Sequence, residues 1–246
     1  MLSPLKNLEK KVNDFCERDM EIQLTILDFA YLYTVNDVEN YKELSLPNGF
    51  SSNKDIMNVD YEDYVSLSEK IAHHIIEKSI IGINDGKVDR SWIGPIFVIQ
   101  KEVYVNVSNI GIDLYKGNSG IALYMASLYE VTKNNYYKKA TEEIINTAIL
   151  LVESVGMEEM KKYSIGVGAF NGLTGIIYVL SHIGNLLEEN SYKKLAINYL
   201  VELTKDIEEI PSDNIDIIAG LSGLLSVIIS VYNHASDDDK KIVIKC

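Results

Sequence analysis

The sequence repeats the pattern Gly-x-x-Gly three times, as Gly117-Asn118-Ser119-Gly120, Gly172-Leu173-Thr174-Gly175 and Gly220-Leu221-Ser222-Gly223. The first glycines of successive copies lie 55 and 48 residues apart (172 − 117 and 220 − 172). A period near 50 residues is typical of proteins built from stacked repeats. One such motif alone indicates a helix entry loop, but three copies at nearly equal spacing predict a repeated architecture.

The same pattern of apolar and polar residues follows each copy of the motif. A segment that is apolar nearly all round comes first, at residues 121–126, 176–180 and 224–229. A polar break and an amphipathic segment come next, at residues 136–152 and 192–207. A helix that is apolar on every side must be buried on every side. We therefore expect buried inner helices to alternate with half-exposed outer helices in two concentric layers.

Residues 1–105 have a different pattern of apolar and polar residues. Helical spacing of apolar residues predicts helices at about 5–15, 18–33 and 61–81, with an irregular stretch at 35–60 and a turn at 84–87. Two β-rich runs, 91–99 and 103–107, predict a small hairpin in which Pro95 takes an edge position or a bulge. The fold class is therefore all-α with a small β-hairpin, and the chain divides into residues 1–105 and 106–246.

Composition excludes several classes of function. The chain has 36 Asp and Glu against 23 Lys and Arg, a net charge of −13, which disfavours binding to nucleic acid. No apolar run is long enough for a transmembrane segment. The two cysteines, Cys16 and Cys246, form no disulfide framework and indicate a reducing, cytoplasmic location. No Cys-x-x-Cys or His-Glu-x-x-His motif occurs, so we expect no cofactor or metal bound by this chain alone.

Three segments resemble the first three repeats of lanthionine synthetase cyclase domains. They are residues 113–123 (DLYKGNSGIAL), 168–182 (GAFNGLTGIIYVLSH) and 216–223 (DIIAGLSG). Residues 19–26 (DMEIQLTI) and 91–94 (SWIG) resemble the end of the dehydratase and the junction in the bifunctional class II enzymes, the LanM type. The resemblance implies a partial α/α toroid of LanC-like helical hairpins.

The family chemistry follows from the same resemblance. In the full-length family, zinc activates a cysteine thiol of a precursor lanthipeptide, which adds to a dehydrated Ser or Thr to close a thioether ring. The family's zinc ligands are two cysteines and a histidine, in Cys-x-Gly and Cys-His-Gly contexts of later repeats, and neither motif occurs here. We therefore expect a fragment that is inactive alone, and self-association through the open face of the toroid.

One catalytic position of the family has a counterpart. Asp216 stands four residues before Gly220, where the cyclases carry a catalytic acidic residue. Asp113 has the same offset in the first repeat, so the offset is not diagnostic by itself. A carboxylate at a helix start is also favoured by the helix dipole alone.

The remaining candidates predict local structural roles. We expect His73 and His74 on the surface, His182 and His234 as hydrogen-bonded structural residues, and Cys16 in packing. Two other functions stay open. One is a non-catalytic helical-repeat scaffold that binds a peptide on its concave face. The other is an α/α-toroid glycoside hydrolase, whose paired carboxylates would be Asp113 and Asp216.

Overall fold

The computed structural model describes residues 15–35, 60–84, 86–99, 103–163, 166–205 and 214–246, together with Leu5, Lys6, Glu9, Val12 and Asn13. Most of the helix expected at 5–15 and of the irregular stretch at 35–60 lies outside these residues. The chain forms two compact units, one of residues 1–58 and 93–109 and the other of residues 59–92 and 110–246. Residues 59–92 thus group with the repeats, although their sequence texture resembles the N-terminal region.

The first unit contains a helix and a β-hairpin. Helix α2 (Glu17–Val35) packs against the antiparallel strands β3 (Ile93–Ile99) and β4 (Val103–Asn109). This hairpin was expected, and Pro95 pairs with Val107 in a continuous register without a bulge. Proline is tolerated because both strands of a two-stranded ribbon are edge strands. Cys16 is exposed before α2, so its expected packing role was wrong.

The second unit begins with a helix and a second hairpin. Helix α3 (Tyr61–Glu77) starts at a capping box in which the Asp60 and Asp63 side chains each accept from the other's backbone N–H. It ends four residues before the expected boundary at 81, because β1 (Ile80–Asn84) pairs antiparallel with β2 (Lys87–Ser91). The turn between them contains Gly86 at a φ of 77°, a conformation that favours glycine.

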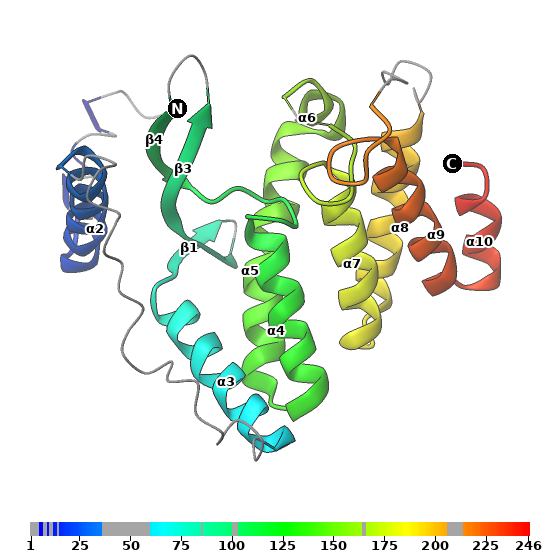
Figure 1. Cartoon of the computed structure of the whole chain (residues 1–246), viewed down its shortest axis with the longest axis horizontal. Helices are drawn as coiled ribbons and strands as arrows, with labels where there is room; N and C mark the ends of the chain where they lie inside the picture. The colour runs from blue at the N-terminus through cyan, green and yellow to red at the C-terminus, as the bar shows by residue number, and fades with distance from the viewer. Residues whose placement is uncertain are drawn as a thin grey trace, which may run out of the picture. The chain divides into compact units, whose positions relative to one another are not determined.

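The repeats follow as helical hairpins (Figure 1). The inner helices are α4 (Asn118–Thr132), α7 (Thr174–Leu186) and α9 (Leu221–His234). The outer helices are α5 (Asn135–Val155), α8 (Asn190–Thr204) and α10 (Asp237–Val243). The short helix α6 (Met157–Tyr163) follows α5 in the chain and packs against both α5 and α8. Helix α7 packs against both α4 and α9, and each inner helix packs against the outer helix that follows it. The predicted alternation of inner and outer helices is confirmed.

The motif glycines permit close backbone contact at the start of each inner helix. A Cβ atom on the second glycine of each motif would lie within 2.7 Å of a carbonyl oxygen three residues before the first glycine, in the pairs Gly120–Leu114, Gly175–Ala169 and Gly223–Ile217. No real side chain fits at that distance, so the loop can fold back on the helix only if glycine is present.

Helix α3 covers the first inner helix. The Tyr124 hydroxyl of α4 donates to the Ser68 carbonyl over 2.7 Å, and the Tyr137 hydroxyl of α5 lies 3.1 Å from Glu69. Burial and the bond to Glu69 raise the pKa of Tyr137 to about 12. These bonds join α3 to the first hairpin.

Across the part of the chain that the structure describes, no helix combines the length and apolar character needed to cross a bilayer.

Candidate functional site

Asp216 lies in the loop that leads into α9, and its carboxylate is exposed. Its Oδ1 accepts hydrogen bonds from the backbone N–H groups of Ile218 at 2.6 Å and Ala219 at 2.9 Å. Asp113 has a similar local role in the first repeat, where its Oδ1 accepts from the Lys116 N–H at 2.8 Å. Both carboxylates therefore shape their own loops, and one oxygen of Asp216 is left for other partners.

The three loops before the inner helices lie side by side and share backbone hydrogen bonds. The Tyr115 N–H donates to the Phe170 carbonyl, and the Phe170 N–H donates to the Ile218 carbonyl, each over 3.1 Å. These three residues occupy the same place, two before the first glycine of each motif. In the third loop the equivalent N–H, that of Ile218, donates to Asp216. The three loops thus form one edge of the repeat unit, and Asp216 lies in the third loop along this edge.

Hydroxyl groups close each loop in the same way. The third residue of each motif donates a side-chain hydrogen bond to the carbonyl five residues before the first glycine, in the pairs Ser119–Ile112, Thr174–Val167 and Ser222–Ile215. The bond is 2.8 Å long for Thr174, which is completely buried. Sequence reasoning missed this role, although the hydroxyl shared by all three motifs was a readable signal.

His182 and His234 meet at the far ends of α7 and α9. Their rings lie 4.5 Å apart at 88°, His182 Nε2 lies 3.3 Å from the Ser230 hydroxyl, and His234 Nδ1 lies 3.1 Å from the Ser181 hydroxyl. Burial and the neighbouring His234 lower the pKa of His182. Burial and the charge of Lys193 lower the pKa of His234. The hydrogen bonds agree with the structural role expected for both residues.

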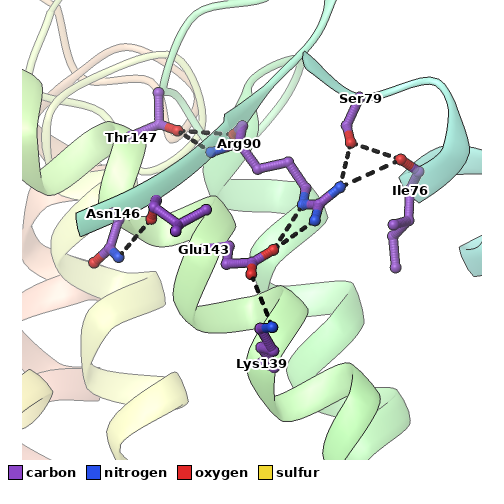
Figure 2. Close-up of polar contacts among 8 residues, drawn as sticks. Ile76, Ser79, Arg90, Lys139, Glu143, Asn146 and Thr147 are labelled. Carbon is purple, nitrogen blue, oxygen red and sulfur yellow. Dashed lines mark hydrogen bonds and ion pairs between the residues drawn. The ribbon is translucent and has the colours of Figure 1, made fainter. Parts of the chain in front are cut away.

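An ion pair fastens β2 to the outer helix α5 (Figure 2). Arg90 donates to Glu143 Oε2 through Nη2 at 2.6 Å and Nε at 3.0 Å, and both side chains are nearly buried. Its Nη1 donates to the Ser79 hydroxyl at 2.6 Å, and Thr147 of α5 bonds both the N–H and the carbonyl of Arg90. This network holds the hairpin against the first repeat. No local pattern in the sequence signals it.

Residues 108–246 match the family model for lanthionine synthetase C-like proteins. The chain belongs to this family. It is also similar to the lacticin 481/lactococcin biosynthesis protein LcnDR2 of Lactococcus lactis subsp. lactis, with 23% identity over 249 residues. The alignment covers 97% of this chain and 24% of that protein, so the chain spans about a quarter of its length.

The family assignment confirms the resemblance read from the glycine motifs. The matched region contains all three LanC-like repeats and Asp216. The alignment with LcnDR2 extends the similarity beyond the repeats into the N-terminal part of the chain. Neither match supports the peptide-binding scaffold or the glycoside hydrolase.

The described residues do not fit the zinc ion that the LanC-like family implies. Among them, no three His, Cys, Asp or Glu side chains come close enough to share a metal ion. His182 Nε2 and His234 Nδ1 each face a serine hydroxyl. The Cys246 thiol lies 3.8 Å from the carbonyl of Ile242, in its own helical turn. We therefore derive no chemical step through zinc from these residues.

The last LanC-like inner helix has an open apolar face. Leu225 and Ile229 occupy in α9 the positions of Ile177 and Ser181 in α7, and of Ala122 and Ala126 in α4. The residues of α4 and α7 are completely or almost completely buried, whereas Leu225 and Ile229 are 59% and 53% exposed. They line a groove of 610 Å³ between α9 and α10. The face that buries one repeat against the next is therefore uncovered on α9.

Proposed function

We propose that this chain supplies three cyclase repeats of a class II lanthipeptide synthetase. The substrate is a precursor peptide whose Ser and Thr residues are dehydrated and whose Cys thiols then add to them. The observation that carries the proposal is the family match over residues 108–246, which contains three loops of the same construction. A cytoplasmic location is part of the proposal and agrees with the two separate cysteines.

Asp216 is the residue we propose for proton transfer in ring closure. The thiol gives up its proton, its sulfur bonds to the β-carbon of the dehydrated residue, the double-bond electrons move to the α-carbon, and one proton is returned to that carbon, so the net change is addition of S–H across the double bond. A side chain that carries the proton must be accessible and held in place. Asp216 meets both conditions, because it is exposed and two backbone N–H groups hold its Oδ1.

Peptide binding is the property that this chain can show by itself. The probe is a fluorescent synthetic peptide with one dehydrobutyrine and one cysteine, titrated with the purified chain while fluorescence anisotropy is measured. We expect saturable binding that an unlabelled copy reverses. Equal binding of a polar control peptide of the same length, or no binding, would overturn the proposal.

The role of Asp216 is tested in a longer synthetase that contains these three repeats and has about the full length of LcnDR2. We expect Asp216→Asn to slow thioether formation, measured by loss of free thiol in mass spectra. Asp113→Asn is the matched control, because Asp113 has the same offset and the same kind of loop bond. Equal rates for the two variants would contradict the assignment.

We further propose that the open face of α9 binds a second copy of this chain. The groove is apolar, and α10 beside it begins with three aspartates followed by Lys240 and Lys241, which pair with Asp237 and Asp238 of the same helix. A two-fold axis would place the aspartates of one α10 beside Lys240 and Lys241 of the other, and these charges are complementary. Apolar and charged contacts then favour the same arrangement.

Sedimentation equilibrium tests this association. We expect a dimer whose dissociation increases with salt and which Leu225→Ser combined with Ile229→Ser abolishes. Leu67→Ser on α3 is the control, because Leu67 is exposed to a similar extent, 56% against 59% for Leu225. A monomer at all concentrations, or a dimer that the α9 variant leaves intact, would refute the second copy as the occupant.

A further inference from the structure

A pocket of 520 Å³ lies where the three inner helices begin. Equivalent residues of the three repeats form its walls. Leu123, Tyr178 and Ser226 each stand six residues after the first glycine of their motif. Leu114, Ala169 and Ile217 each stand three residues before it. We propose that this pocket binds one large apolar side chain, aromatic or leucine-like, of the peptide substrate.

The lining determines the chemistry of the ligand. No charged side chain of the described residues lines the pocket, and its polar side chains are the hydroxyl-bearing Tyr115, Tyr178 and Ser226. Burying a charge against such walls would be unfavourable, because no counter-charge is present. An apolar group gains about 25 cal/mol for each Å² that it removes from water. The pocket therefore selects an uncharged, apolar group of side-chain size.

The walls are held in place before any ligand arrives. The Tyr178 ring lies 4.2 Å from the ring of His182, which contacts the Ser230 hydroxyl at 3.3 Å. The loop that carries Leu114 is bonded through its own N–H to the Phe170 carbonyl at 3.2 Å. A ligand then loses less binding energy to ordering the site, because the site is already ordered.

The pocket lies beside the residue proposed for proton transfer, so a peptide side chain bound there would position the substrate. Ile217, part of the wall, is the residue next to Asp216, the group proposed for proton transfer. A peptide residue seated in the pocket would hold its neighbours beside that carboxylate. This step rests on the proposed function for the identity of the ligand as a peptide, whereas the preference for an apolar group rests on the pocket alone.

The test uses N-acetyl-L-phenylalaninamide as probe and N-acetyl-L-alaninamide as comparison. With methyl-labelled chain, we expect the phenylalanine probe to shift the methyl signals of Leu114, Leu123 and Val227, all of which line the pocket, and to leave those of Leu225 unchanged. The alanine probe should bind at least tenfold more weakly. Shifts spread over the surface, or equal binding of the two probes, would overturn the proposal.

A matched pair of variants checks the same point. Ser226→Phe fills the pocket from α9, and Ser127→Phe adds the same ring to an exposed serine of α4 that does not line it. Both serines donate to the carbonyl four residues earlier, so the helices lose the same bond. We expect Ser226→Phe to abolish probe binding and Ser127→Phe to retain it.

The proposed peptide-binding function and the pocket assignment are contradicted by different results. If the amino-acid probe occupies the pocket but the dehydrated peptide does not bind, the proposed function is wrong and the pocket assignment stands. If the peptide binds and Ser226→Phe leaves its affinity unchanged, the pocket assignment is wrong.

Discussion

Removing the charge of Glu143 should destabilise the repeat unit strongly. In Glu143→Gln, the Arg90 guanidinium loses its counter-charge while its side chain stays 13% exposed. Breaking one partner of a buried pair costs about 3–5 kcal/mol. Ser79 still accepts one of the Arg90 hydrogen bonds, so we expect a value near the lower end, about 3 kcal/mol.

The control lies on the same carboxylate. Lys139 Nζ lies 3.8 Å from the other oxygen of Glu143, and its side chain is 77% exposed. Exposed pairs contribute about 0–1 kcal/mol, so Lys139→Met should have little effect. Replacing Arg90 by Met and Glu143 by Leu together should recover most of the loss, because no unpaired charge then remains.

Thermal unfolding followed by circular dichroism at 222 nm measures these effects. For a domain of roughly 150–250 residues, each kcal/mol moves Tm by about 2–4 °C. Glu143→Gln should therefore lower Tm by about 6–12 °C. A shift no larger than that of Lys139→Met, or a double variant as unstable as the single one, would refute the account of this network.

Three further predictions concern the loops and the histidines. Thr174→Val should lower the free energy of unfolding in urea by about 1–3 kcal/mol, because it leaves the Val167 carbonyl without its hydrogen-bond partner. Thr132→Val is the control, since the Thr132 hydroxyl donates only to the Leu128 carbonyl of its own helix, and equal losses for the two variants would contradict the loop role. Asp216→Asn should leave the unfolding midpoint unchanged because the amide oxygen still accepts two N–H bonds, whereas Asp216→Ala should lower it; the reverse order would be inconsistent with this loop. The pKa of His182 is lowered from its ordinary 6.5, so its stabilising contribution is complete above that pH and is lost as pH falls towards the folded-state pKa. His182→Gln should therefore reduce the loss of stability between pH 7.5 and 5.5, and an unchanged loss would contradict the shift.

The sequence predicted the repeats because their signal is local and occurs three times. Each glycine motif comes directly before an apolar helix, so Gly172 and Gly220 could be placed without any long-range contact. The structure adds the reason for the second glycine, which is the approach of a carbonyl oxygen. The shared Ser or Thr in each motif was visible, but its acceptor carbonyl was not.

Other features had no readable local signal. The apolar residues from Ile80 to Ile83 continue the pattern of α3, so the helix was predicted too long, and only pairing with β2 shows the strand. Arg90 and Glu143 lie 53 residues apart, and nothing near either residue predicts the partner. The pocket likewise depends on three loops meeting side by side, which the motif spacing alone does not establish.

Photo-crosslinking tests directly whether the three repeats bind a dehydrated peptide at the edge formed by their loops. The peptide carries one dehydrobutyrine, one cysteine and one benzoylphenylalanine, and mass spectrometry locates the crosslinked residue. We expect crosslinks to Tyr115, Phe170 or Tyr178, which line the pocket, and their loss in Ser226→Phe. Crosslinks confined to the outer helices α5 and α8, or unchanged in Ser226→Phe, would contradict it.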